Sequence, residues 1–182
     1  MNLKNIIFLA LTIFMIFLSA CASKSDGVPA AVRNLEKFKF ATIDHPNITA
    51  PSFTLTDNKD NKISNEMLKE KVYIVQGFAP GCSSCAREIA TLNNLFSKYH
   101  DKGLEIISLD VSSNDISGTL DTKQKFNGGD WHWAIDTDDV AVKFGIASLE
   151  STYVVDKNGI ITYKDETISD VDILSQEIEK II

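Results

Sequence analysis

Residues 72–100 read VYIVQGFAPGCSSCAREIATLNNLFSKYH and decide the fold, because they place two cysteines between an apolar strand and an amphipathic helix. The run 72–75 is apolar and rich in β-formers, which predicts a short strand. Apolar side chains then recur at helical spacing and predict a helix over 82–100: Ile89, Leu92, Leu95, Phe96 and Tyr99. Cys82 and Cys85 would lie at i and i+3 on its first turn, where they can form a reversible disulfide.

A redox role is the leading interpretation of this cysteine pair. The N-terminus of a helix stabilises negative charge, so it favours the thiolate form of Cys82. Two alternatives stay open for a CxxC sequence, a fixed structural disulfide and half of a zinc site. The strand before the pair and the helix after it favour the redox interpretation over both alternatives.

The first twenty residues have the pattern of an export signal. Lys4 is the only charged residue among them, and residues 6–20 form an uncharged, mainly apolar run. A membrane-spanning helix needs about 20 apolar residues, so this run is short for a span and suits the core of a secretion signal. It leads into LSAC at 18–21, which resembles the lipobox of bacterial lipoproteins and predicts a lipid on Cys21. An ordinary signal peptide and an uncleaved anchor with a chance cysteine are the alternatives.

Three segments are therefore expected: a lipoprotein signal peptide over 1–20, a lipidated tether over 21–45 and a folded domain over 46–182. Small and polar residues over 22–30 suit a flexible tether, and residues 31–40 could form a short amphipathic helix. The lipid would hold the domain at a membrane, outside the cytoplasm. Since only two cysteines remain in the domain, its stability must come from a packed core.

The charge balance argues against nucleic-acid binding. The chain has 18 Lys and Arg against 25 Asp and Glu, a net charge of −7. The leader contains one basic residue and no acidic one, so the part that follows it has a net charge of −8. Because no run of basic residues occurs, a nucleic acid would find no electrostatic footprint, and an anionic membrane surface would repel the domain.

The rest of the chain alternates between strand and helix patterns. Strands are expected at 53–56, 72–78, 104–111, 134–135, 152–155 and 160–163, and helices at 64–69, 82–100, 117–126, 138–144 and from 169 onward. The sequence DKNG at 156–159 predicts a hairpin between the last two strands. This order predicts an α/β fold with a mixed central sheet.

Four stretches carry a resemblance to a known family. They read APSFTLTDNKDNKIS at 50–64, KVYIVQGFAPGCSSC at 71–85, LEIISLDV at 104–111 and FGIASLESTYVVDKNGIITY at 144–163. In this order they resemble the thioredoxin-like domain of TlpA/ResA-type lipoproteins, which are thiol–disulfide oxidoreductases of the AhpC/TSA-redoxin superfamily. The resemblance implies a thioredoxin-like fold, with a mixed central β-sheet flanked by helices and an N-terminal β-hairpin. It also implies disulfide exchange without a cofactor.

The resemblance further implies roles for individual residues. Cys82 matches the exposed nucleophile of the family, and Cys85 matches the resolving thiol. Glu88 matches the glutamate of a CxxCxxE pattern, which lies near the active site and tunes the thiols. The alternative for Glu88 is a solvated carboxylate on the helix surface. Phe78 aligns with an aromatic residue at the strand end and is expected in the core.

The chain also departs from the family pattern. Glu150 occupies the position of a cis-proline that faces the CxxC in thioredoxin-like domains. Because a non-proline cis bond costs about 2.5–4 kcal/mol, we expect a trans peptide and a rearranged substrate loop there. This change would open space beside the sulfurs for a metal or for the Glu150 carboxylate. Gly81 replaces a tryptophan and Gln76 replaces the buried acid of thioredoxin, so proton handling would fall to Glu88, Glu150 or water.

These features predict an extracytoplasmic, membrane-tethered enzyme that exchanges disulfides with protein thiols through Cys82 and Cys85. If Glu88 and Glu150 lie close to the sulfurs, they raise the pKa of Cys82, which predicts a reductant, for example in cytochrome c or oxidase maturation. A reductant outside the cytoplasm needs a membrane thiol donor, because that compartment has no reducing pool.

A copper metallochaperone for respiratory oxidase assembly is the main alternative. Soft thiolates favour Cu(I), and copper carriers of this fold combine two cysteines, normally spaced CxxxC, with a remote histidine. His132 is the histidine expected on the active-site side, whereas His45 and His100 are expected at the surface. Our leading interpretation includes no resident metal.

Two further possibilities are weaker. A peroxidase of the peroxiredoxin type needs a threonine three residues before the attacking cysteine, and Ala79 stands at that position. Trp131 and Trp133 could form a substrate surface, but buried packing of the two indoles is the favoured interpretation.

Overall fold

The computed structural model describes residues 43–182. The expected signal peptide, Cys21, the expected helix at 31–40 and most of the expected tether therefore lie outside the described residues. The strands are β1 (Ile48–Thr49), β2 (Thr54–Thr56), β3 (Lys62–Ser64), β4 (Val72–Phe78), β5 (Leu104–Asp110), β6 (His132–Ile135), β7 (Thr152–Val155) and β8 (Ile160–Asp165). The helices are α3 (Cys85–Tyr99), the short 3-10 helix η3 (His100–Lys102), α4 (Ile116–Lys125), α5 (Val140–Phe144) and α6 (Val171–Glu179). Among these described helices, none has the length and apolarity that a bilayer crossing requires.

A six-stranded mixed sheet forms the centre of the fold. Its strand order is β1-β8-β7-β4-β5-β6, and β2 and β3 form a separate antiparallel hairpin. Strand β4 runs parallel to β5, and β5 runs parallel to β6. Strand β7 is antiparallel to both β4 and β8, and β1 is antiparallel to β8. The predicted α/β fold with a mixed central sheet is therefore confirmed.

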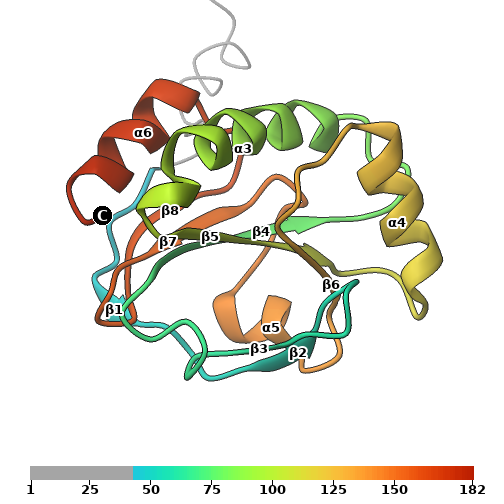
Figure 1. Cartoon of the computed structure of the whole chain (residues 1–182), viewed down its shortest axis with the longest axis horizontal. Coiled ribbons are helices and arrows are strands. Elements are labelled where there is room, and N and C mark those ends of the chain that lie inside the picture. The colour runs from blue at the N-terminus through green and yellow to red at the C-terminus, as the bar shows by residue number, and fades with distance from the viewer. Residues whose placement is uncertain (1–42) are drawn as a thin grey trace, which may run out of the picture. The chain divides into compact units, whose positions relative to one another are not determined.

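Different elements cover the two faces of the sheet. Figure 1 shows α3, α4 and α6 on one side, and the β2–β3 hairpin with α5 on the other. Successive residues of a strand point to opposite faces, so Ile74 belongs to the core under α3, whereas Tyr73 and Val75 belong to the core under the hairpin. All seven residues of β4 are buried, as expected of a strand with neighbours on both sides and cover on both faces.

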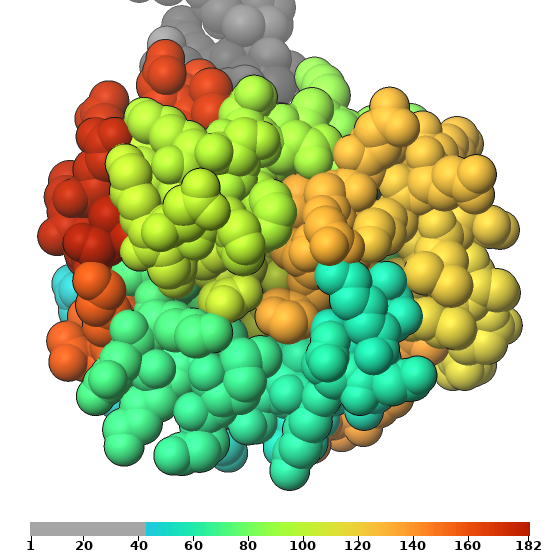
Figure 2. All heavy atoms as spheres, in the orientation of Figure 1, coloured from blue at the N-terminus to red at the C-terminus, as the bar shows by residue number. Residues whose placement is uncertain are grey.

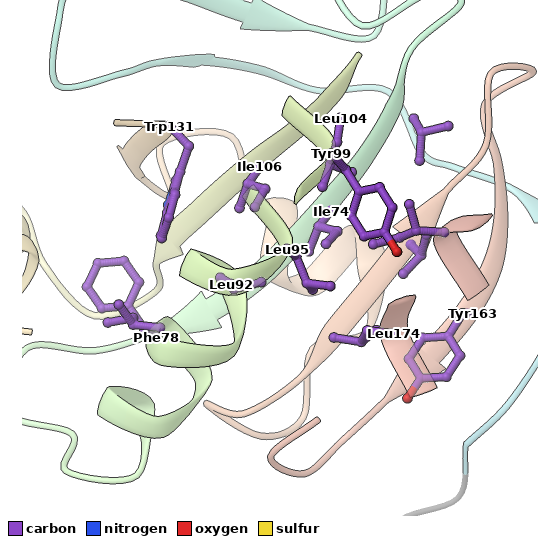
Figure 3. Close-up of a cluster of buried hydrophobic side chains, with 14 of the residues drawn as sticks. Ile74, Phe78, Leu92, Leu95, Tyr99, Leu104, Ile106, Trp131, Tyr163 and Leu174 are labelled. Carbon is purple, nitrogen blue, oxygen red and sulfur yellow. The ribbon is translucent and has the colours of Figure 1, made fainter. Parts of the chain in front are cut away.

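The core under α3 explains why residues 85–99 form an amphipathic helix. Leu92 and Leu95 are fully buried and face Ile74 and Ile106 of the sheet (Figure 3). Phe78 also lies in this core, as predicted. Burying a leucine side chain contributes roughly 1.5–3 kcal/mol, so this apolar stripe, rather than helix propensity alone, holds α3 on the sheet.

Some predicted boundaries are wrong. The helix expected at 64–69 is a series of turns, in which the N–H of Leu68 donates to the carbonyl of Ser64 at 3.0 Å. The next backbone hydrogen bonds, from Lys69 to Glu66 and from Lys71 to Leu68, span only three residues, so the segment forms successive turns and not a continuous α-helix. The main helix begins at Cys85 rather than at residue 82, because the chain first has to turn at the end of β4. Strand β6 begins at His132, two residues earlier than expected, through parallel pairing with Ile107.

Candidate active site

Cys82 lies in the turn between β4 and α3, and Cys85 is the first residue of α3. The sulfurs of Cys82 and Cys85 lie 2.12 Å apart and form a disulfide. The backbone N–H of Cys82 donates to the carbonyl of Ala79 at 3.2 Å, and Gly81 has a φ of +84°, in the left-handed region that favours glycine. Cys85 is fully buried, whereas Cys82 is partly exposed. Cys82 is therefore the sulfur that a partner can reach.

The sulfur of Cys82 caps the N-terminus of α3. The backbone N–H of Cys85, the first residue of the helix, points at this sulfur from 3.2 Å. The residue just before the helix, Ser84, makes no capping hydrogen bond with its side chain. Cys82 thus precedes the helix, and the expectation that both cysteines lie on its first turn is wrong. An N–H donor and the helix dipole both stabilise negative charge at this position, and a favoured thiolate on Cys82 stays a prediction.

The loop 148–151 lies against the disulfide. The carbonyl oxygen of Leu149 is 3.8 Å from the sulfur of Cys85, and it also accepts a hydrogen bond from the side-chain amide of Gln76 at 3.4 Å. The N–H of Gly77 donates to the carbonyl of Ser151 at 3.1 Å, which ties the loop to β4. Every peptide bond within residues 43–182 is trans, so the prediction of a trans peptide at Glu150 is confirmed.

Glu150 is hydrogen-bonded to Ser84, the second of the two serines between the cysteines. The hydroxyl of Ser84 donates to one carboxylate oxygen of Glu150, and the hydroxyl of Ser148 donates to the other at 2.6 Å. These hydrogen bonds, the one from Ser148 above all and then the one from Ser84, hold the pKa of the Glu150 carboxyl below its usual range. A carboxylate therefore lies one hydroxyl group away from the Cys82 sulfur.

Glu88 is fully buried, so the alternative of a solvated surface carboxylate is wrong. Its carboxylate accepts one hydrogen bond from the hydroxyl of Thr152 at 2.7 Å and another from the backbone N–H of Ser169 at 2.9 Å. Burial raises the pKa of Glu88 to about 7, even though both hydrogen bonds favour the charged form. Glu88 thus places a group that titrates near neutral pH one helical turn beyond Cys85.

A buried chain of hydrogen bonds, not anticipated from the sequence, supports the loop from behind. The indole N–H of Trp131 donates to the hydroxyl of Ser108 at 3.0 Å, and that hydroxyl donates to the side-chain oxygen of Gln76 at 3.2 Å. The amide of Gln76 then reaches the carbonyl of Leu149. The available signal was a polar residue inside each of two apolar strands, because Gln76 and Ser108 are register partners on β4 and β5.

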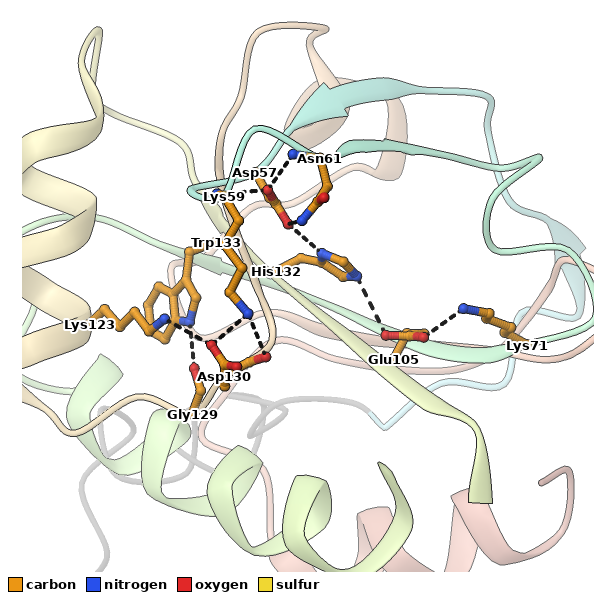
Figure 4. A network of polar contacts seen from close by, with 10 residues as sticks. All are labelled: Asp57, Lys59, Asn61, Lys71, Glu105, Lys123, Gly129, Asp130, His132 and Trp133. Carbon is orange, nitrogen blue, oxygen red and sulfur yellow. Dashed lines mark hydrogen bonds and ion pairs between the residues drawn. The ribbon is translucent and has the colours of Figure 1, made fainter. Parts of the chain in front are cut away.

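The structure corrects the expectation that His132 lies on the active-site side. Trp131 and Trp133 pack in the core under α3, as predicted for buried indoles, so the alternation of β6 turns His132 to the opposite face. There its Nδ1 lies 2.8 Å from the carboxylate of Asp57, next to the β2–β3 hairpin. Its Nε2 lies 3.5 Å from Glu105 (Figure 4).

His132 belongs to a network of charges rather than to the cysteine site. The ammonium group of Lys71 lies 2.7 Å from the other oxygen of Glu105. The hydrogen bond to Glu105, and next that to Asp57, raise the pKa of His132 above its ordinary value. A hydrogen bond from His132 is also the main cause that lowers the pKa of Glu105 to about 2.

An open cleft adjoins this network. It has a volume of about 720 Å³ and is lined by residues of the hairpin, the end of α3 and the start of β6, including His100 and His132 but neither cysteine. These segments meet on the face shown in Figure 2. Within residues 43–182, no group of three or more His, Cys, Asp or Glu side chains could hold a metal ion. The two-cysteine, one-histidine set that a copper carrier would use is therefore not assembled in the part of the chain described.

Comparisons with known proteins find a matching family model and several curated relatives of the chain. A sequence model of the AhpC/TSA family matches residues 46–164. The thiol-disulfide oxidoreductase ResA of Bacillus thuringiensis subsp. konkukian is 33% identical over 114 residues, which cover 60% of this chain and 63% of ResA. The chain thus spans about 63% of the length of this curated relative.

Solved structures share the fold at lower identity. A thiol:disulfide interchange protein of the thioredoxin family from Chlorobium tepidum superposes with a TM-score of 0.66 at 18% identity, over 76% of this chain and 98% of that chain. The thioredoxin domain of a thiol-disulfide oxidoreductase from Bacteroides vulgatus superposes with a TM-score of 0.63 at 24% identity, over 74% and 95%. These likenesses confirm the thioredoxin-like fold.

Proposed function

Because the chain belongs to the AhpC/TSA family, we propose that it is a thiol–disulfide oxidoreductase that works through Cys82 and Cys85. The observation that carries this proposal is the disulfide between a partly exposed Cys82 and a buried Cys85 at the N-terminus of α3. One reachable sulfur and one protected sulfur are what a two-step exchange needs. The partial likeness to ResA supports the same activity.

The exchange begins from the reduced pair. The thiolate of Cys82 attacks one sulfur of a target disulfide, a bond forms between the two sulfurs, and the second target sulfur leaves as a thiolate that takes a proton from water. Cys85, once deprotonated, attacks the sulfur of Cys82 and releases the first target sulfur. The target disulfide gains two electrons, and the Cys82–Cys85 disulfide forms again.

We assign the reducing direction to the protein. The helix N-terminus favours negative charge on Cys82, but the carboxylate of Glu150 opposes it through its contact with Ser84. A less acidic nucleophile is typical of reductants, because a stabilised thiolate is what makes a strong oxidant. The oxidised pair then needs a membrane thiol donor to reduce it for the next cycle.

Glu88 is proposed as the proton store of the resolving step. Its carboxyl, with a pKa raised to about 7 by burial, lies one turn beyond Cys85 and is hydrogen-bonded to Thr152 of β7. A group half-protonated near neutral pH can accept the proton that Cys85 loses and return it when the pair is reduced. Cys85 itself lies among apolar side chains, where a thiol resists ionisation without such help.

We also propose where the domain acts. LSAC at 18–21 supports cleavage after residue 20 and lipidation of Cys21, with residues 21–45 as the tether and residues 46–182 as the domain. This arrangement would hold the cysteine pair outside the cytoplasm, where protein disulfides are its targets, in cytochrome c or oxidase maturation for example. The orientation of His132 toward Asp57 gives the copper-carrier alternative no support.

A redox titration of the full chain tests the proposal. The Cys21→Ser background leaves only the Cys82–Cys85 pair to titrate, and defined ratios of reduced to oxidised dithiothreitol set the potential. We expect a two-electron midpoint for the pair and catalysed reduction of insulin disulfides, both lost in Cys82→Ser. A pair that stays oxidised in excess dithiothreitol would mark a structural disulfide. Stoichiometric Cu(I) retention that depends on Cys82, without insulin reduction, would favour the copper carrier.

A further inference from the structure

The hydroxyl of Ser84 lies between two competing acceptors. Its oxygen is 3.3 Å from the sulfur of Cys82, and it donates a hydrogen bond to the carboxylate of Glu150. A serine hydroxyl has one proton to donate, so it cannot serve both acceptors fully at the same time. Ser84 is therefore a shared donor between the reactive sulfur and the loop 148–151.

The redox state of the pair decides which acceptor is stronger. In the disulfide, the sulfur of Cys82 is uncharged and accepts hydrogen bonds weakly. The Ser84 hydroxyl therefore donates its hydrogen bond to the carboxylate of Glu150. After reduction, a thiolate on Cys82 carries a full charge, and hydrogen bonds to charged acceptors are roughly twice as strong as neutral ones. The thiolate then competes with Glu150 for the same proton.

We propose that Glu150 and Ser84 are positioning residues that control how readily Cys82 becomes a thiolate, because Glu150 holds the hydroxyl proton that the thiolate needs. Two effects act in the same direction. The carboxylate withdraws a donor from the sulfur, and its negative charge disfavours a second negative charge nearby. The inference rests on the proposed function, and it explains how a glutamate at this position keeps Cys82 a moderate nucleophile.

The other polar and charged groups near the site do not remove the competition between Cys82 and Glu150 for the Ser84 hydroxyl. Arg87 is exposed on the first turn of α3 and favours the charged form of Glu150, so the carboxylate remains an acceptor at neutral pH. Ser148 holds the second carboxylate oxygen at 2.6 Å and keeps it close to Ser84. Glu88 uses its carboxylate on Thr152 and Ser169 instead. The N–H of Cys85 reaches the Cys82 sulfur independently of Glu150.

A double-mutant cycle on Cys82 alkylation tests the proposal. The full chain in a Cys21→Ser background carries Glu150→Gln, Ser84→Ala or both. After reduction, the rate of iodoacetamide reaction at Cys82 is followed against pH, with peptide mapping to separate it from Cys85. We expect Glu150→Gln to increase the thiolate fraction of Cys82 at pH 6 by about three- to tenfold. Glu150→Asp, which keeps the charge, should stay closer to the parent chain.

The coupling between the two substitutions is the decisive readout. Ser84→Ala should decrease the thiolate fraction at least threefold more in the Glu150→Gln background than in the parent, since there the thiolate competes for the hydroxyl only with a neutral amide oxygen. Independent, multiplicative effects, or an unchanged pH profile in Glu150→Gln, would overturn the proposal. Insulin reduction is scored separately. A chain that shows the coupling but reduces no protein disulfide would refute the proposed function and leave this inference standing.

Discussion

The backbone N–H of Ser169 donates a hydrogen bond to the carboxylate of Glu88 at 2.9 Å, across 81 residues of sequence. Together with Thr152, Ser169 satisfies a carboxylate that has no exposure to water. Because Ser169 lies just before α6 and Thr152 starts β7, one buried side chain of α3 connects three parts of the fold. Its protonation therefore bears on the stability of the fold.

Glu88 should make the oxidised protein less stable as the pH rises from about 4.5 to about 7. Burial raises the folded-state pKa of Glu88 to about 7, against 4.5 for an unperturbed glutamate. Between these values the folded state keeps a proton that the unfolded chain releases. The stabilisation is complete below pH 4.5 and is lost as the pH rises to 7, by roughly 3 kcal/mol at most. Urea unfolding of wild type and Glu88→Gln from pH 4 to 8 measures it.

The difference between the two unfolding curves isolates Glu88 from other titrating groups. We expect the stability of wild type relative to Glu88→Gln to fall across the window, because glutamine does not titrate. The exposed Glu66 provides the matched control, and Glu66→Gln should show no such trend. A difference that stays constant from pH 4.5 to 7 would contradict a raised pKa for Glu88.

His132 should stabilise the protein most at mildly acid pH. Its pKa is raised by Glu105 first and then by Asp57, so the folded state favours the charged imidazole. This contribution is fully present below the unfolded pKa of about 6.5 and is lost as the pH rises through the higher folded value. We expect His132→Gln to lower the free energy of unfolding by about 1–3 kcal/mol at pH 6 and by less at pH 9. His100→Gln, at an exposed histidine, should show no such pH trend.

Most of the fold could be predicted from two periodicities. The apolar run of β4 and the apolar stripe of α3 lie next to each other in the sequence, so their packing depends on residues close together in the chain. The helix expected at 64–69 is wrong although Ser64 resembles a helix cap, because the backbone hydrogen bonds after Leu68 close three-residue turns and do not continue an α-helix. Its segment instead ends at Glu70, which has a φ of +62°.

The site could be predicted only in part from the sequence. The Cys82–Cys85 pair is three residues apart, so its geometry follows from local structure. The contact of Ser84 with Glu150 joins residues 66 positions apart. No sequence pattern indicates which hydroxyl group forms a hydrogen bond with a carboxylate so far along the chain. The orientation of His132 could have been found, since strand alternation places it opposite the two buried tryptophans that flank it.

The two cysteines should behave differently when mutated one at a time. In a Cys21→Ser background, Cys85→Ser leaves the partly exposed Cys82 without a resolving thiol, so a mixed disulfide should accumulate with glutathione disulfide. Cys82→Ser leaves only the buried Cys85, which should react at least tenfold more slowly, because burial both shields the thiol and disfavours its ionisation. Intact-mass spectrometry under non-reducing conditions measures the adduct. Equal adduct on both variants would contradict the assignment of the nucleophile.

Removing the small hydroxyl of Ser108 should lower the free energy of unfolding. It accepts from the indole of Trp131 and donates to Gln76, so Ser108→Ala leaves a buried donor and a buried acceptor without partners. An unsatisfied buried polar group costs about 1–3 kcal/mol, and we expect a loss of that order in the free energy of urea unfolding. Ser83→Ala, at an exposed serine of the CxxC, should stay within about 0.5 kcal/mol of wild type.

Since Gln76 also donates a hydrogen bond to the carbonyl of Leu149, hydrogen exchange in residues 148–151 should speed up in Ser108→Ala only. Equal stability of the two variants would show that Gln76 and Trp131 find other partners, and the loop would then not depend on this chain of hydrogen bonds.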